Sequence, residues 1–230
     1  MSSVTSDPDK LRILYPDDDG EPMSDNTLQF QWIVTLQGGL DALFRDRPDV
    51  FVAGNLLWYP VEGHSEIRQA PDALVVFGRP KGYRGSYIQW VEDNVAPQVV
   101  FEVLSPGNRF ARLKYKFGFY DQYGVEEYYI YNPDRAVLEG WRRVDGVLVE
   151  ISEMNGWISP LLGIRFDLSS GELQIFRPDG QPFATYLELA EQKEEERQAR
   201  EQAQQRAEQE KQRAERLAAQ LRALGVKPEE

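Results

Sequence analysis

The sequence predicts an α/β domain with a mixed sheet flanked by helices, followed by a long charged helix. Short apolar runs bounded by turn residues alternate with two segments of helical periodicity, which is the pattern of an α/β fold. In two of the central runs both faces are apolar, as expected of strands that are covered on both sides. From about Tyr186 the composition changes to charged residues, glutamine and alanine, with no Gly or Pro between Ala184 and Gly225, which predicts the terminal helix.

The first expected helix opens the domain, which we place at 24–184 after an irregular arm at 1–23 that is rich in Asp and Pro. Ser24 is a suitable N-cap for this helix. Apolar residues then recur at helical spacing and define a core-facing stripe of Leu28, Trp32, Leu36, Leu40 and Leu43. Gly38 and Gly39 weaken the helix, because glycine costs backbone entropy in a helix interior.

Three runs of strand-like composition follow, at 50–63, 70–78 and 97–105. A second helix is expected within 108–124, and Gly124 provides its C-terminal signal. The apolar stripe of this helix consists of Phe110, Leu113, Phe117 and Tyr120.

The strands in the later part of the domain are predicted to be antiparallel. Residues 125–133 have the composition of another strand, and shorter strand-like segments follow at 136–151, 163–170 and 172–178. We expect these segments to extend the sheet, so that the domain has the order helix, strands, helix, strands.

The charged tail is expected at 185–225, ahead of a flexible end at 226–230. Its possible seam residues are spaced alternately by four and three, and all but one are Ala or Leu: Ala203, Ala207, Glu210, Ala214, Leu217, Leu221 and Leu224. This heptad seam predicts a coiled coil that joins two copies of the chain into a homodimer. A single charged helix stabilised by i,i+4 pairs is the alternative.

The composition of the chain argues against several classes of function. The chain has 26 Lys and Arg against 38 Asp and Glu, and the net charge of −12 argues against a broadly basic nucleic-acid surface. It has no cysteine, so neither disulfides nor thiolate chemistry is expected. The apolar runs are too short for a membrane span and the start lacks the order of a secretory signal, so we expect a cytoplasmic protein that does not bind membranes.

Two acids stand in or beside apolar strands. Asp72 begins one such run and Glu102 lies inside another, where an unpaired charge is costly because it leaves water. If the two strands are antiparallel neighbours, both carboxylates converge near one end of the sheet and form an oxygen-only site suited to Mg²⁺. The motifs contain no His or Cys, which disfavours zinc. The alternative is that each acid caps a strand or pairs with an arginine.

The order "PD", then "FEVLSPGNR", then a helix bearing lysine and tyrosine, then "YGVEEYYIYNP" resembles the Uma-two family of restriction endonucleases. That family belongs to the PD-(D/E)XK nuclease superfamily, and the resemblance covers roughly residues 24 to 180. It implies a restriction-endonuclease-like fold and a metal-dependent endonuclease that hydrolyses DNA phosphodiester bonds. Members of the family also often end in a charged coiled-coil tail.

The resemblance assigns roles to individual residues. Asp72 and Glu102 match the metal ligands, with Mg²⁺ as the implied ion and Mn²⁺ as its substitute. The superfamily's lysine normally stands two residues after the second acid, where this chain has Leu104. The family usually supplies the lysine from the following helix, and the matching residue is Lys116, with Tyr120 one turn later.

The helix leaves some choices open. Lys114 and Lys116 lie equally far from the apolar stripe on opposite sides, so the resemblance alone selects Lys116. Arg112 is a second departure, because relatives commonly have an acid there. Arg109, seven residues before Lys116 on the same flank, is a candidate phosphate contact, with a solvated surface arginine as the favoured alternative, and Tyr120 is a second candidate substrate contact. The alternative function is a degenerate nuclease fold that binds nucleic acid or protein without catalysis and is assembled through its tail.

Three further features have mainly structural interpretations. His64 is the only histidine and lies in a polar segment, so we expect it at the surface. Glu62 is also expected there, although its position before Asp72 makes it a candidate third carboxylate. The segment 79–93 mixes basic and aromatic residues, which suits the gripping of single strands, but a connection whose aromatic residues close over the core explains it as well.

Overall fold

The computed structural model describes residues 15–18, 20, 24, 26–106 and 110–223. The chain divides into two compact units, residues 1–183 and residues 184–230. The first unit contains all the strands and the second contains a single long helix.

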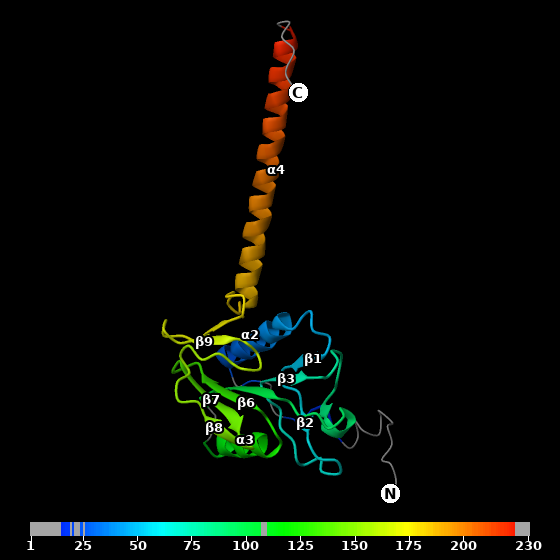
Figure 1. Cartoon of the computed structure of the whole chain (residues 1–230), viewed down its shortest axis with the longest axis vertical. Coiled ribbons are helices and arrows are strands. Elements are labelled where there is room, and N and C mark those ends of the chain that lie inside the picture. Colours follow the sequence, from blue (N-terminus) through cyan, green and yellow to red (C-terminus); the bar gives the residue numbers. More distant parts are fainter. Residues whose placement is uncertain (1–14, 19, 21–23, 25, 107–109, 224–230) are drawn as a thin grey trace. The chain divides into compact units, whose positions relative to one another are not determined.

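The first unit is built on a six-stranded mixed sheet with the strand order β1-β3-β5-β6-β7-β8 (Figure 1). The strands are β1 (Val50–Ala53), β3 (Ala73–Phe77), β5 (Val99–Val103), β6 (Glu127–Asn132), β7 (Val137–Val144) and β8 (Val147–Glu150). All neighbours are antiparallel except β5 and β6, which are parallel and are connected through α3 (Phe110–Gln122). Parallel neighbours need such a crossover. The predicted α/β domain with a mixed sheet is confirmed.

Each face of the sheet is covered by one helix (Figure 1). On one face, Leu36 of α2 (Thr27–Leu43) packs in the same cluster as Val75. On the other face, Tyr120 of α3 packs in the same cluster as Val100. All five residues of β5 are buried, so a charged side chain on this strand points into the interior of the domain.

The helix α2 begins two residues later than a Ser24 cap predicts and turns a shifted face to the core. Asn26 caps it instead, because its side-chain oxygen accepts a hydrogen bond from the backbone N–H of Gln29 at 2.8 Å. Leu28 is 39% exposed, which corrects its placement in the core. The buried residues of the helix are Gln29, Ile33, Leu36 and Leu40.

One of the two glycines in α2 is required by packing. A Cβ atom on Gly39 would run into the ring of Phe183, whereas a Cβ on Gly38 would meet no described atom within 4 Å. The residue at position 39 therefore has to be small if Phe183 is to keep its place against the helix.

The run at 50–63 is not one strand but two. β1 and β2 (Trp58–Tyr59) are separated by a bend in which Asn55 has a φ of 49°. β2 pairs in parallel with β4 (Tyr87–Ile88), which leads into the 3₁₀ helix η1 (Gln89–Val91). A small sheet thus forms outside the main one, and the sequence patterns did not predict it.

The segment after β6 is only partly as predicted. β7 and β8 form the expected hairpin across Asp145 and Gly146, whose φ values of 51° and 87° suit a two-residue turn. β9 (Arg165–Asp167) and β10 (Gln174–Phe176) pair with each other in a separate sheet, so the prediction that they extend the main sheet is wrong. Their apolar side chains, including Phe166, instead cover the core on the α2 face.

The basic and aromatic residues of the segment 79–93 stabilise the domain rather than forming a surface for single-stranded nucleic acid. Arg79 and Arg84 both pair with Glu92, at 3.0 Å and 2.5 Å. Arg84 also lies over the ring of Phe51, 4.0 Å from its centroid. Trp90 packs edge-on against Tyr15, with 4.9 Å between the ring centroids. The basic and aromatic side chains of the segment are therefore largely used inside the domain.

Most of the N-terminal arm lies outside the described residues, but Tyr15 is buried. Its hydroxyl accepts a hydrogen bond from the backbone N–H of Gly63 at 2.7 Å, and Tyr59 donates a hydrogen bond to the carbonyl of Pro16 at 2.8 Å. These contacts fix one point of the arm to β2 and to the loop that follows it.

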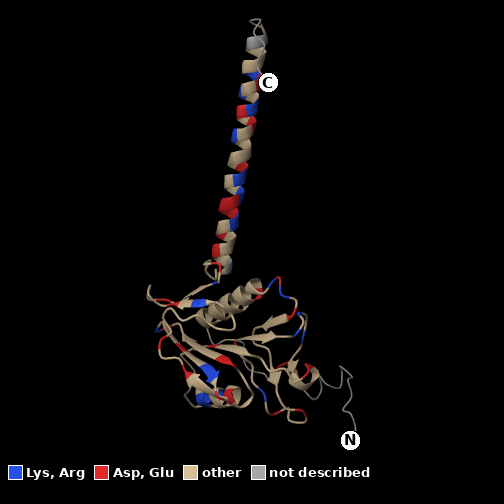
Figure 2. Ribbon diagram, viewed as in Figure 1, with Lys and Arg blue, Asp and Glu red and all other residues tan. Residues whose placement is uncertain are grey.

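The second unit contains α4 (Tyr186–Ala223), along which acidic and basic residues are interspersed (Figure 2). A capping box starts it: the Glu188 carboxylate accepts from the backbone N–H of Thr185 at 2.7 Å, and the Thr185 hydroxyl accepts from the N–H of Glu188 at 3.3 Å. In the described part of the chain, no helix is both long and apolar enough to cross a membrane.

Candidate functional site

Asp72 and Glu102 are brought together by the pairing of β3 with β5. The two strands are antiparallel, with Ala73 opposite Phe101 and Leu74 opposite Val100. Continuing this register by one residue places Asp72 opposite Glu102, on the sheet face that α3 covers. The prediction that the two acids converge at one end of neighbouring antiparallel strands is confirmed.

The carboxylate of Glu102 is held by two side chains from α3. Lys116 Nζ donates to Oε2 at 2.6 Å, and the hydroxyl of Tyr120 donates to Oε1 at 2.6 Å. Asp72 is fixed differently, because its Oδ2 accepts from the backbone N–H of Val103 at 2.6 Å. Glu102, Lys116 and Tyr120 thus form one hydrogen-bonded cluster between the sheet and α3, and Asp72 lies beside it.

Lys114 and Lys116, which helical spacing alone could not distinguish, have different positions in the structure. Lys116 is 9% exposed and reaches Glu102, whereas Lys114 is exposed on the outer side of α3. Leu104, at the position of the superfamily's usual lysine, packs against the apolar cluster on the α3 face. The Glu102 carboxylate is therefore reached by a lysine from the helix, while the strand position holds an apolar side chain.

Burial raises the pKa of Asp72 to about 8, and the neighbouring negative charge of Glu102 adds to this effect. The positive charges of Lys116 and Arg112 act in the opposite direction. Burial also raises the pKa of the Tyr120 hydroxyl well above its ordinary value, so this group remains a hydrogen-bond donor to Glu102. The site is therefore a place where negative charge is costly and where a bound cation would relieve the cost.

The raised pKa of Asp72 predicts a pH-dependent stability of the metal-free protein. A carboxyl group whose pKa is higher in the folded than in the unfolded state takes up protons on folding between its ordinary value near 4 and about 8, so its contribution to stability falls as pH rises through this window. We expect the Asp72→Asn variant to gain stability relative to the wild type by several kcal/mol between about pH 5 and pH 8.

Urea unfolding of both proteins in the presence of EDTA measures this difference. The comparison reports Asp72 together with its interaction with Glu102, because the remaining titrating groups are common to both proteins. A wild-type-to-variant difference that does not change over this pH range would contradict the burial of an uncompensated carboxyl group at this position.

The other proposed residues join the cluster to different degrees. Arg112 is exposed but near enough to Asp72 to oppose its pKa shift. Arg109 lies outside the described residues. His64 is exposed and lies 2.9 Å from Glu66 through its Nδ1, and Glu62 is exposed as well. Among the described residues, no hydrogen bond or ion pair connects His64 or Glu62 with the two acids.

Sequence reasoning missed the backbone contacts that hold the site. The N–H of Val103 fixes Asp72, and the carbonyl of Val103 accepts from Nε2 of the buried Gln29 at 2.8 Å. α2 is thereby bonded to Val103, next to Glu102, which holds the two side chains of α3 on the other face of the sheet. Gln29 lies outside the stripe predicted from the sequence, and only the shifted buried face of α2 reveals it as a buried polar residue that needs a partner.

A family model described as "Putative restriction endonuclease", Uma2, matches residues 7–169, which is more than half of the chain. The chain belongs to the Uma2 family. The resemblance drawn from the sequence motifs is thereby confirmed, together with the restriction-endonuclease-like fold.

A solved structure of another protein is also similar. It is described as a putative nuclease belonging to DUF820 from Anabaena variabilis; the match has 12% sequence identity and a TM-score of 0.44, and covers 61% of this chain and 74% of that one. No curated protein matches the sequence.

The Uma2 site suits a hard divalent cation. Asp72 and Glu102 offer carboxylate oxygens side by side, and Mg²⁺ commonly binds to one or two carboxylates while it keeps waters and substrate phosphates as its other ligands. No further His, Cys, Asp or Glu completes a cluster of three in the part of the chain that is described. The remaining ligands would therefore come from water, backbone or substrate.

Proposed function

We propose that this Uma2 protein is an endonuclease that hydrolyses DNA phosphodiester bonds with Mg²⁺, for which Mn²⁺ can substitute. The observation that carries the proposal is the convergence of Asp72 and Glu102, with Lys116 only 2.6 Å from the Glu102 carboxylate. Family membership supports the nuclease class, and the oxygen-only pair of acids supports the choice of metal.

Asp72 and Glu102 would hold the cation through their carboxylate oxygens. When bound, Mg²⁺ polarises a phosphodiester and lowers the pKa of a coordinated water. Lys116, beside Glu102, would orient the attacking water or neutralise the charge that develops on the phosphoryl oxygens. Tyr120 fixes the orientation of the Glu102 carboxylate, which is a positioning role.

The basic residues at the start of α3 would meet the substrate locally. Arg112 is exposed close to Asp72, and it can contact a phosphate where relatives have an acid. Arg109 precedes it and stays a proposed phosphate contact. Because the chain as a whole has a net charge of −12, we expect such local contacts, rather than the overall field, to bring DNA to the site.

Incubation of the protein with supercoiled plasmid tests the proposal. Mg²⁺ or Mn²⁺ should produce open-circular and then linear DNA, and EDTA should abolish both products, because the two carboxylates cannot bind a phosphate without a cation. Cleavage that persists in EDTA, or an absence of cleavage with both metals, would contradict the proposal.

One observation favours the alternative of a non-catalytic module. Both oxygens of Glu102 are already engaged, and Asp72, Glu102 and Lys116 are only 6%, 3% and 9% exposed. Metal binding must therefore displace or share one of these contacts. DNA binding without cleavage in the same plasmid assay would support this alternative.

A further inference from the structure

The helix α4 carries a repeat that the proposed nuclease site does not use. From Glu194 to Leu221 four successive heptads begin with glutamate: EEERQAR, EQAQQRA, EQEKQRA and ERLAAQL. Seven residues fall slightly short of two turns of a straight α-helix, so a strict seven-residue repeat keeps one stripe against a partner only when two helices supercoil. The repeat therefore indicates that α4 packs lengthwise against another helix.

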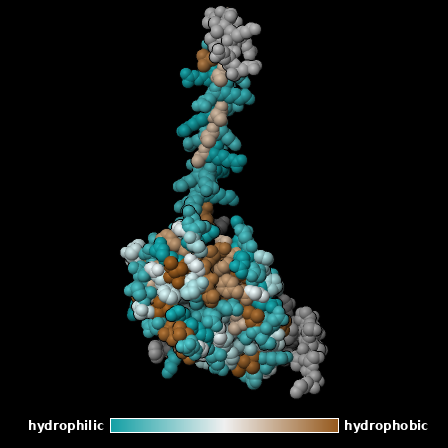
Figure 3. Space-filling view, viewed as in Figure 1, coloured by the Kyte–Doolittle hydropathy of each residue, from teal (hydrophilic) through white to brown (hydrophobic). Residues whose placement is uncertain are grey.

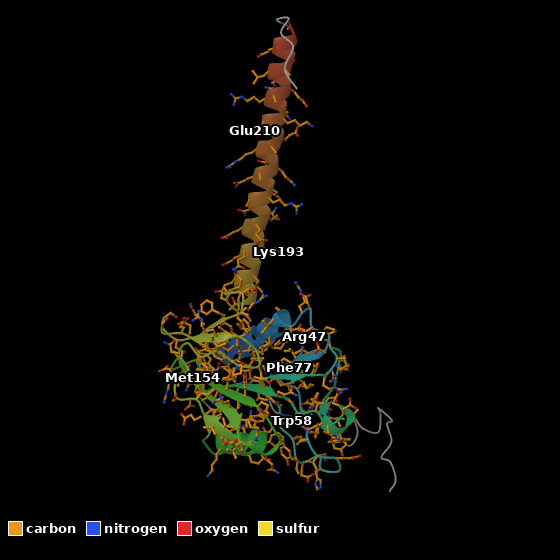
Figure 4. The ribbon with its side chains drawn as sticks, viewed as in Figure 1. Arg47, Trp58, Phe77, Met154, Lys193 and Glu210 are labelled. Atoms are coloured by element: carbon orange, nitrogen blue, oxygen red, sulfur yellow. The ribbon has the colours of Figure 1, made fainter. Side chains whose placement is uncertain are left out.

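The stripe is visible as a pale line along the otherwise hydrophilic tail (Figure 3). Its described members are Ala203, Ala207, Glu210, Ala214 and Leu217. Leu217 is 51% exposed. Glu210, which Figure 4 labels on α4, occupies the position between Ala207 and Ala214 in the stripe. The side chain of Leu221, and Leu224 as a whole, lie outside the described residues.

The positions that flank the stripe are basic or uncharged. On one side they are Arg197, Gln204, Lys211 and Ala218. On the other side they are Ala199, Arg206, Arg213 and Gln220. The acids at the start of each heptad lie on the back of the helix instead. The flanks from Arg197 to Gln220 therefore carry basic but no acidic residues, although Arg216 also lies on the back and the acidic and basic residues of α4 are similar in number.

The basic flanks are largely unpaired within α4. In the described part of the helix, the ion pairs are those of Arg197, which contacts Glu194 and Glu201 at 2.6 Å each. Three other flank residues have no ion pair with any described residue: Arg206, Lys211 and Arg213. In the described part of α4 the alternative of a lone helix stabilised by i,i+4 pairs is thus supported by one such pair, that of Arg197 with Glu201.

A second copy of the chain cannot neutralise these flanks. In a parallel pair, Arg206 would face Lys211 of the second copy, and in an antiparallel pair each flank would face its own kind. Because neither flank contains an acid from Arg197 to Gln220, no register of self-pairing brings opposite charges together there. In an in-register parallel pair, two Glu210 carboxylates would also meet in the seam.

We infer that α4 is a docking helix for a different helical partner, one with an apolar seam flanked by Asp or Glu and with a basic residue opposite Glu210. Flank charges set partner choice in coiled coils, and a buried charged position sets the register. This inference is independent of the nuclease site. The homodimer predicted from the seam alone stays a prediction, and the flank charges favour the different partner over it.

DNA is the other class of partner that basic residues suggest. The strict repeat and the apolar stripe favour a helix over DNA, because phosphate binding requires neither of them. The glutamates on the back of every heptad would also repel a duplex.

Two synthetic peptides with the sequence of residues 194–223 test the inference. Both peptides carry E210K, which places a lysine opposite Glu210 of the chain. Only one of them, the acid-flanked peptide, also carries the flank substitutions R197E, R206E, K211E and R213E. Calorimetric titration into the full chain at low salt should show that the acid-flanked peptide binds at least about tenfold more tightly than the basic-flanked one. Sedimentation of the full chain alone should show a monomer.

Variants of the full chain provide the matched control. The R206E/R213E pair on the flanks should remove the preference for the acid-flanked peptide, whereas E208Q/E215Q on the back of the helix should preserve it. Circular dichroism confirms that α4 stays helical in each variant.

Three outcomes would overturn the inference. The first is a full-chain dimer that disappears on truncation near Ala184, which would show self-pairing. The second is equal or absent binding of the two peptides. The third is binding of a DNA duplex that is lost in the R206E/R213E variant, which would assign the flanks to nucleic acid.

Discussion

The Asp72→Asn variant is expected to lose DNA cleavage by at least about 10³-fold while it remains folded. Asparagine has nearly the same shape and its side-chain oxygen can still accept the Val103 N–H, so the backbone contact survives. The negative charge that would hold the cation is lost. Plasmid cleavage at saturating Mg²⁺, together with a urea unfolding curve, measures both parts of the prediction.

The Glu102→Gln variant should lose cleavage to a similar extent but should also be less stable. It leaves the buried ammonium of Lys116 without its carboxylate, and a buried charge that loses its partner costs about 3–5 kcal/mol. Glu62→Gln is the matched control, because Glu62 is an exposed acid in the segment between β2 and β3 and should retain wild-type cleavage. If the Asp72→Asn variant cleaved DNA at the wild-type rate, the proposed role of Asp72 as a metal ligand would be wrong.

Asp72 and Glu102 could be predicted as site residues because charged side chains are rare in buried apolar strands. A carboxylate in a strand such as "VVFEV" has to be paired or to bind something, and strand alternation places Asp72 and Glu102 on one face once their strands are neighbours. The choice of Lys116 over Lys114 required more, because helical geometry alone leaves the two equivalent. The resemblance made that choice, and the burial of Lys116 agrees with it.

Contacts between distant segments could not be predicted from these patterns. The apolar residues of α2 fit two overlapping stripes, and only packing against the sheet decides that Ile33 rather than Leu28 is buried. β9 and β10 have ordinary strand composition, but nothing local says that they cover the core rather than extend the sheet. The support of Asp72 by the Val103 N–H is likewise set by strand register.

The Lys116→Ala variant is expected to lose cleavage rate by about 10²–10³-fold with little loss of metal affinity. An ammonium group carries no lone pair and cannot ligate Mg²⁺, so its removal spares the ligands, and it also frees one oxygen of Glu102 from a competing contact. Cleavage rates at saturating metal, and the Mg²⁺ concentration at half-maximal rate, separate the two effects.

Lys114→Ala is the control that distinguishes a positioned lysine from a general effect of positive charge. Lys114 lies on the same helix two residues away and carries the same charge, but it is exposed and makes no contact with Glu102. Removing it changes the general attraction for phosphate as much as removing Lys116 does, while leaving the positioned ammonium in place. Equal losses in the two variants would show that overall charge was being measured. A loss confined to Lys116→Ala would show that the lysine acts because α3 places it beside the paired acids.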